Sequence, residues 1–233
     1  MKVISVFGAI VAMAAPVVTI QPALAATQTI TYTGSVAEGT FDYGGVFGTP
    51  SAYLSGLAYT AVFVLDTSLG IYASGCGDGY CYSQYYGGQY NGSTSPVTAI
   101  LNINGKSHVF LGTSGFSSSF SDVATGVYSQ HQDQVHDGIS NDDIYGYAHS
   151  FDDSLIPASV TEPFNIYAYN VIYRQLYFQI STPIGVTYSN GYDSIASVIS
   201  SAAPEPASWA LMIAGMGAVG GAMRRRKVRV AYA

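Results

Sequence analysis

Short segments with strand-like patterns of apolar and polar residues run through the middle of the chain. Residues 27–33 alternate threonine with Gln, Ile and Tyr, and residues 57–65 form a nearly continuous apolar run that ends at Asp66. Successive side chains of a strand point to opposite faces of a sheet, so a period of two indicates a strand with one buried face. We therefore expect β-strands at both segments.

An Asn-Gly pair marks a turn between two further segments of this kind. Asn104-Gly105 separates 97–103 from 106–111, and both central positions of a type I′ turn need the positive φ that Asn and Gly tolerate. The pattern therefore predicts a β-hairpin. More strands are expected at 165–180 and at 193–200.

The composition of residues 26–203 supports an all-β domain. This region is poor in Lys, Glu, Leu and Met and rich in Tyr, Thr, Val, Gly and Ser, which favours strands and turns over helices. Its aromatic content places it outside the disordered class. We expect one antiparallel β-sandwich or jelly-roll-like domain, because the predicted strands are short and closely spaced.

The N-terminus has the features of a secretion signal. Lys2 precedes an apolar run over 3–20, and Ala23-Leu24-Ala25 supplies the small residues that signal peptidase needs. We predict a signal peptide over 1–25 that is cut after Ala25. The alternative is a retained N-terminal membrane helix.

Charge excludes one class of partner for the exported region. Thirteen acidic side chains lie within 26–203, against the two basic residues Lys106 and Arg174, which gives a net charge of about −11. Such a body repels nucleic acids and anionic lipid surfaces. Cations and neutral, hydroxyl-rich molecules are the small partners that this charge allows.

The end of the chain combines a proline motif, an apolar run and a basic cluster. Residues 207–223 are apolar and about long enough to span a bilayer, and the basic residues that follow suit its cytoplasmic side. We therefore predict a transmembrane helix at about 207–223 that anchors 26–203 on the periplasmic side of the inner membrane. The residues expected to form the signal are Pro204, Glu205, Pro206, Trp209, Ala210, Arg224, Arg225 and Arg226.

Residues 204–229 closely resemble the PEP-CTERM sorting domain of exported Gram-negative proteins, in the variant that reads Pro-Glu-Pro-x-x-Trp-Ala. The resemblance implies recognition by a membrane-embedded exosortase, which cuts near the motif and passes the body to the cell surface or medium. It also implies a link with exopolysaccharide and biofilm production. The same segment is labelled after ice-binding proteins that carry it.

The chain has two cysteines, Cys76 and Cys81, in a short Gly-rich segment. Because an exported protein meets an oxidising compartment, we expect a disulfide between them that staples a small loop. A metal site would need further ligands, and a redox site more typically has Cys-x-x-Cys.

Acidic residues gather between 131 and 153, with no basic residue among them. We expect a solvated acidic loop. The alternative is a Ca²⁺ site with Asp133, Asp137, Asp142 and Asp143 as ligands, since Ca²⁺ takes carboxylate oxygens from flexible loops. The spacing does not match the EF-hand pattern. A zinc or catalytic site is a third option.

The middle of the chain shows no enzyme motif. Gly-x-Ser-x-Gly and His-Glu-x-x-His are both missing, and adjacent carboxylates such as Asp142-Asp143 make a poor acid–base pair. We expect no enzymatic activity and no cofactor, with Ca²⁺ as the alternative, in a cell-surface or extracellular-matrix protein whose body has a structural or undefined role. Alternatives are a Ca²⁺-dependent carbohydrate-binding module that uses the tyrosines of 80–90, an ice-binding protein and a secreted hydrolase.

Overall fold

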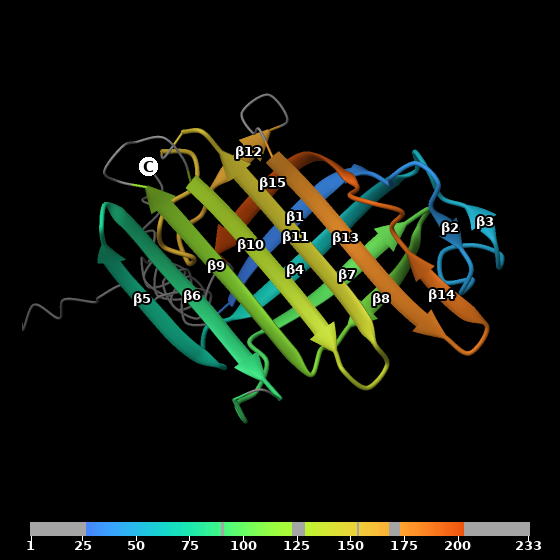
Figure 1. The fold of residues 1–233 in the computed structure, drawn as a ribbon, viewed down its shortest axis with the longest axis horizontal. Coiled ribbons are helices and arrows are strands. Elements are labelled where there is room, and N and C mark those ends of the chain that lie inside the picture. Colours follow the sequence, from blue (N-terminus) through green and yellow to red (C-terminus); the bar gives the residue numbers. More distant parts are fainter. Residues whose placement is uncertain (1–26, 90, 123–128, 153, 168–172, 203–233) are drawn as a thin grey trace, which may run out of the picture.

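The computed structural model describes residues 27–89, 91–122, 129–152, 154–167 and 173–202. Within these ranges the protein consists of antiparallel strands and contains no helix. Two large sheets pack face to face, and Figure 1 shows their strands crossing, with the second sheet in front. The all-β expectation is confirmed, and the arrangement is a β-sandwich.

The first sheet has six strands in the order β12-β15-β1-β4-β7-β8. β15, the last described strand, pairs with β1, the first. The bounds are β1 Thr27–Ser35, β4 Ala58–Asp66, β7 Val97–Ile103, β8 Lys106–Phe110, β12 Asn165–Tyr167 and β15 Ser194–Ala202.

The second sheet has seven strands in the order β14-β13-β11-β10-β9-β6-β5. Neighbours in this sheet are mostly consecutive in the chain, so it is largely a meander. The bounds are β5 Ile71–Gly77, β6 Tyr80–Gly88, β9 Ser114–Asp122, β10 Ser129–Asp137, β11 Asp142–Ser150, β13 Tyr173–Thr182 and β14 Gly185–Tyr188. A separate two-stranded sheet pairs β2 (Phe41–Asp42) with β3 (Ala52–Tyr53).

The two sheets contribute differently to the interior. The first sheet follows the expected alternation and buries apolar residues such as Ile30, Phe63 and Leu101. In the middle of the second sheet the inward positions are polar: β9 buries Ser117 and Ser119 while its two phenylalanines face outward. This inverted pattern leaves aromatic side chains on the outer surface of the second sheet.

Part of the polar interior is explained by a loop that enters between the sheets. Ser83 of β6 accepts a hydrogen bond from the Val160 backbone N–H (2.6 Å) and donates one to the Ala158 carbonyl (3.0 Å). Ser129 of β10 similarly accepts from the Ile156 N–H (3.2 Å). Because buried backbone groups must be paired, these serines hold the loop in place.

The strands of the first sheet were well predicted. The segment 97–103 is β7, and Asn104 (φ 55°) and Gly105 (φ 71°) form the expected positive-φ turn to β8. The region 165–180 contains two strands, β12 and the start of β13, in different sheets.

One loop prediction was wrong, because the acidic segment 131–153 is mostly the hairpin of β10 and β11. Most of the tyrosine-rich segment after residue 79 is strand β6. The signal peptide and the C-terminal membrane helix lie outside the described residues. Among the described residues, no helix has the length and apolarity to cross a membrane.

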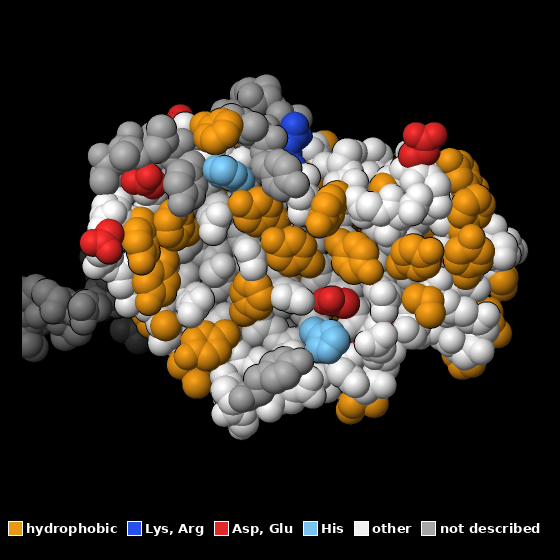
Figure 2. Space-filling model, viewed as in Figure 1, with side chains coloured by type: hydrophobic (Ala, Val, Ile, Leu, Met, Phe, Trp, Pro, Cys, Tyr) orange, Lys and Arg blue, Asp and Glu red, His pale blue; other side chains and the backbone are white. Residues whose placement is uncertain are grey.

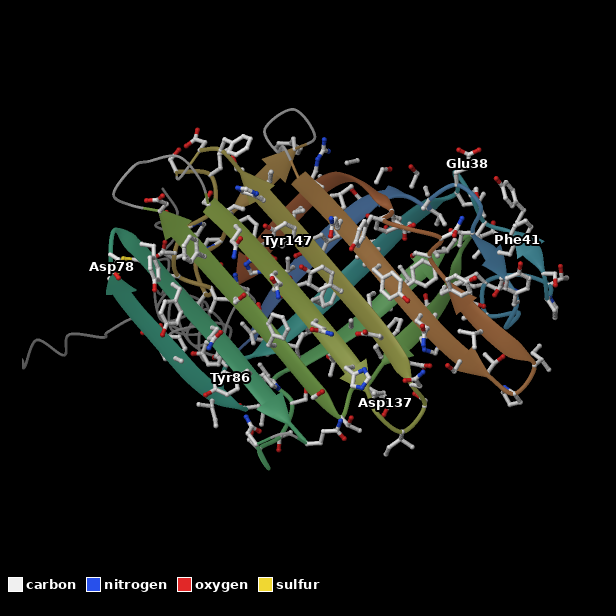
Figure 3. The ribbon with its side chains drawn as sticks, in the orientation of Figure 1. Glu38, Phe41, Asp78, Tyr86, Asp137 and Tyr147 are labelled. Carbon is white, nitrogen blue, oxygen red and sulfur yellow. A yellow bond between two sulfur atoms is a disulfide. The ribbon has the colours of Figure 1, made fainter. Side chains whose placement is uncertain are left out.

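The two cysteines form the expected disulfide, with an S–S distance of 2.05 Å. Cys76 and Cys81 are directly opposite each other on β5 and β6, so the bond joins two strands of a hairpin and the short loop that it closes contains the hairpin turn. Asp78 (φ 49°) and Gly79 (φ 87°) make the turn, beside which Figure 3 shows the disulfide.

We expect thiol labelling of the purified, denatured protein to find no free cysteine before reduction and two after it. Replacing both cysteines by serine should lower the free energy of unfolding by about 2 kcal/mol or less, because closing so short a loop removes little unfolded-state entropy. Two reactive thiols in the unreduced protein would contradict the bond.

Asp193 fixes the start of β15. Its carboxylate accepts from the Ala37 N–H (2.6 Å) and from the Ser189 hydroxyl (3.0 Å) while only 1% of the residue is exposed. Burial raises the pKa of this carboxyl from 3.8 to about 6, and the two hydrogen bonds oppose the rise. The folded protein therefore binds a proton here more tightly than the unfolded chain.

A raised folded-state pKa makes Asp193 stabilising at low pH, and that contribution is lost as the pH rises through about 6. About two pKa units correspond to roughly 3 kcal/mol. Urea unfolding at several pH values should show stability falling between about pH 4 and 6 more steeply in the wild type than in Asp193→Asn. Equal slopes in the two proteins would contradict the assignment.

Candidate functional site

The candidate site is the outer face of the second sheet, defined as the outward side chains of β6, β9, β10, β11 and β13. Aromatic and carboxamide side chains dominate it, and Figure 2 shows hydrophobic side chains spread over this side of the molecule. In Figure 3, Tyr86 and Tyr147 project from it. Its described members include Tyr82, Tyr86, Phe116, Phe120, Gln130, Gln132, Gln134, Tyr145, Tyr147 and Tyr177.

Strand register aligns five of these residues in one row across the sheet, here called the aromatic row. Tyr86 is opposite Phe116, Phe116 is opposite Gln134, Gln134 is opposite Tyr145, and Tyr145 is opposite Tyr177. Neighbouring strands are roughly 4.8 Å apart, so the row is about 19 Å long. It has two aromatic residues at each end and one carboxamide in the middle.

Two adjoining hollows follow this row, and both are lined by Gln134 and Asp143. One, of about 600 Å³, also contacts Tyr86 and Phe116; the other, of about 480 Å³, contacts Tyr145 and Tyr177. Together they form a shallow groove whose centre is the pair Gln134 and Asp143, here called the central pair. The Gln134 Nε2 atom donates to Asp143 Oδ1 over 3.3 Å.

The electrostatics of the groove are set by Asp143. Partial burial raises the pKa of its carboxyl above 3.8, while the Gln134 hydrogen bond and the nearby His136 act in the opposite direction. Burial also raises the pKa of the Tyr177 hydroxyl, helped by the charge of Asp143. At neutral pH the centre of the groove thus offers a carboxylate acceptor beside carboxamide and phenol groups, a set suited to binding hydroxyls.

No lysine or arginine of the described residues lies on the outer face. Lys106 is in the β7–β8 hairpin of the first sheet, and Arg174 donates to the Ile195 carbonyl in β15. The groove therefore offers no lysine or arginine to an anionic ligand, and its basic side chain is the His136 imidazole beside Asp143.

A buried chain of polar groups crosses the interior behind the outer face. The Ser119 hydroxyl contacts His131 Nδ1 (2.8 Å), His131 Nε2 contacts Asp133 Oδ2 (3.0 Å), and the Tyr32 hydroxyl donates to the same oxygen (2.8 Å). The residue types match a serine–histidine–aspartate triad, but each is at most 1% exposed. A substrate has no access to this Ser119, and we interpret these hydrogen-bonded side chains as a structural link between β1, β9 and β10.

The four aspartates proposed as Ca²⁺ ligands do not form one cluster. Asp133 lies in the interior and Asp143 on the outer face, whereas Asp137 ends β10 opposite Asp142 and binds the Ser140 hydroxyl. Asp142 points inward and contacts His108 Nε2 (3.0 Å) and the Ser181 N–H (2.8 Å). Across the part of the chain that the structure describes, no three His, Cys, Asp or Glu residues are placed to hold a metal ion.

The sequence indicated the residues of β6 at one end of this site but not those of β10 and β11 at its centre. Tyr82 and Tyr86 belong to the tyrosine-rich segment that was singled out for sugar binding, whereas Tyr85 of the same segment points inward and packs on Tyr72. Gln134 and Tyr145 were not singled out. The spacing of Phe116 and Phe120 in β9, four residues apart among serines, was a usable signal, because an even spacing places both aromatics on one face of a strand.

Residues 202–227 match the family model of the PEP-CTERM protein-sorting motif. This match covers the expected signal from Pro204 to Arg226, which lies outside the described residues. No curated protein and no solved structure matches the chain. The motif marks an exported protein that an exosortase processes at the membrane before its release to the surface.

Proposed function

We propose that the mature protein is a non-enzymatic component of the extracellular polysaccharide matrix and contacts the polysaccharide through the outer face of the second sheet. The sorting motif supports delivery outside the cell. The observation that carries the contact is the inverted pattern of β9 in the middle of the second sheet, with serine inside and phenylalanine outside. Exposed aromatic groups of this kind mark a binding surface.

The chemistry of the outer face suits sugars. A pyranose ring has apolar C–H faces that pack on aromatic rings and hydroxyl edges that need hydrogen-bond partners. Tyrosines and glutamines lie on neighbouring strands of this face and supply both kinds of contact. A binding mode of this type needs no metal. The second candidate is the Ca²⁺-dependent carbohydrate-binding module, whose binding would be lost when a chelator removes the Ca²⁺.

The proposal is tested by fractionating the native host's extracellular matrix. The mature protein should co-isolate with the washed polysaccharide and should be released when a glycosidase digests that polymer. A strain unable to make the polymer should shed the protein into the medium. Release by a chelator alone would favour the Ca²⁺-dependent candidate, and retention without the polymer would contradict the proposal.

A further inference from the structure

We infer that the groove binds an extended, neutral polysaccharide chain that runs across the strands along the aromatic row, with Gln134 and Asp143 as the specificity-determining pair at its centre. This inference rests on the proposed function and names the class of ligand and the residues that select it.

The shape of the groove favours an extended chain. The two hollows share the central pair and lie on either side of it, so a ligand that fills both must pass over Gln134 and Asp143. The aromatic row of about 19 Å has room for several pyranose rings placed end to end. A single monosaccharide would occupy only one hollow.

The order of side chains along the row assigns a role to each part. Tyr86 and Phe116 at one end and Tyr145 and Tyr177 at the other offer ring surfaces to the C–H faces of sugars. Between them, the Gln134 amide and the Asp143 carboxylate are already hydrogen-bonded to each other (3.3 Å) and are therefore held in place. A fixed acceptor–amide pair discriminates between hydroxyl arrangements, because a sugar with the wrong arrangement leaves partly buried polar groups unpaired.

Charge selects a neutral polymer over an acidic one. Residues 26–203 carry a net charge of about −11, and the two cations of this region lie away from the outer face. A polyuronate or a nucleic acid would place its anions against Asp143, and no lysine or arginine of the described residues lies there to receive them. A hydroxyl-rich neutral chain avoids this repulsion.

The test uses the mature protein purified from the native host, in affinity electrophoresis and calorimetry with soluble glucans, mannans, galactans and a polyuronate. We expect binding to at least one neutral polymer and none to the polyuronate. Tyr145→Ala and Gln134→Ala should each weaken binding by about tenfold. Tyr53→Ala, which removes a tyrosine that is more exposed than Tyr145 from the β2–β3 sheet, is the control and should bind as the wild type does.

The outcomes distinguish a failure of this inference from a failure of the proposed function. Unchanged binding in both groove variants, with melting temperatures equal to that of the wild type, would overturn the inference and leave the proposed function standing. Preference for the polyuronate would also overturn it. Dimerisation that Tyr145→Ala abolishes, without polysaccharide binding, would assign the face to a second copy. Failure to bind the panel and the native polymer alike would overturn both the inference and the proposed function.

Discussion

Asp133→Ala should lower the free energy of unfolding by about 3–5 kcal/mol, which is a large fraction of the stability of a typical domain. In the wild type the Asp133 carboxylate accepts hydrogen bonds from the Tyr32 hydroxyl and from His131 Nε2, and all three residues are 0% exposed. The substitution leaves two buried donors without an acceptor, and each unpaired donor costs about 1–3 kcal/mol. Urea unfolding of the purified protein measures the loss.

Two further variants check that the lost stability comes from the buried hydrogen bonds that link Tyr32, Asp133 and His131. Gln132→Ala removes a half-buried outward side chain from the same strand and should cost less than about 1 kcal/mol. Tyr32→Phe removes one donor and leaves the ring on Gly146, where a Cβ would lie only 2.8 Å from it. Its cost should be about 1–2 kcal/mol. An Asp133→Ala protein as stable as the Gln132→Ala control would contradict the structural role of these buried hydrogen bonds.

Replacing Pro204, Glu205 and Pro206 by alanine should hold nearly all of the protein in the membrane fraction. Because proline disfavours helix, we expect a processing enzyme to recognise this segment in an extended form. The sorting motif at 202–227 includes all three residues. Fractionation followed by immunoblotting should find the triple variant in the membrane, whereas the wild type is found outside the cell.

Ser208→Ala is the matched control for this experiment, because residue 208 occupies a variable position between Pro206 and Trp209 in the motif. This control should be exported and released as the wild type is. Release of the triple variant at the wild-type level would show that processing does not depend on the three residues.

The first sheet could be predicted from the sequence because its strands bury one apolar face. The segment 97–103 matches β7 at both ends, and Asn104-Gly105 specifies the following turn through its backbone preferences. The second sheet was harder to predict because its buried positions include Ser117, His131 and Asp133. A hydrophobic pattern cannot identify a strand whose inward side chains are polar and are paired only in the folded protein.

The groove was missed for a different reason. Its residues come from β6, β9, β10, β11 and β13, which are brought together by strand register and not by proximity in the sequence. Sequence reasoning could mark Tyr86 as exposed and aromatic, but nothing local connects it with Gln134 or Tyr177. The sorting signal shows the opposite situation, since Pro204 to Arg226 form a continuous motif that can be recognised without a fold.

Intact-mass measurement of the protein isolated from the washed polysaccharide matrix of the native host tests release and destination together. We expect a polypeptide that begins after Ala25, ends near Pro206 and contains one disulfide between Cys76 and Cys81. A protein that ends at Ala233 and is confined to the membrane fraction would contradict this expectation, because the C-terminal segment would then be a permanent anchor and the outer face would never reach the matrix.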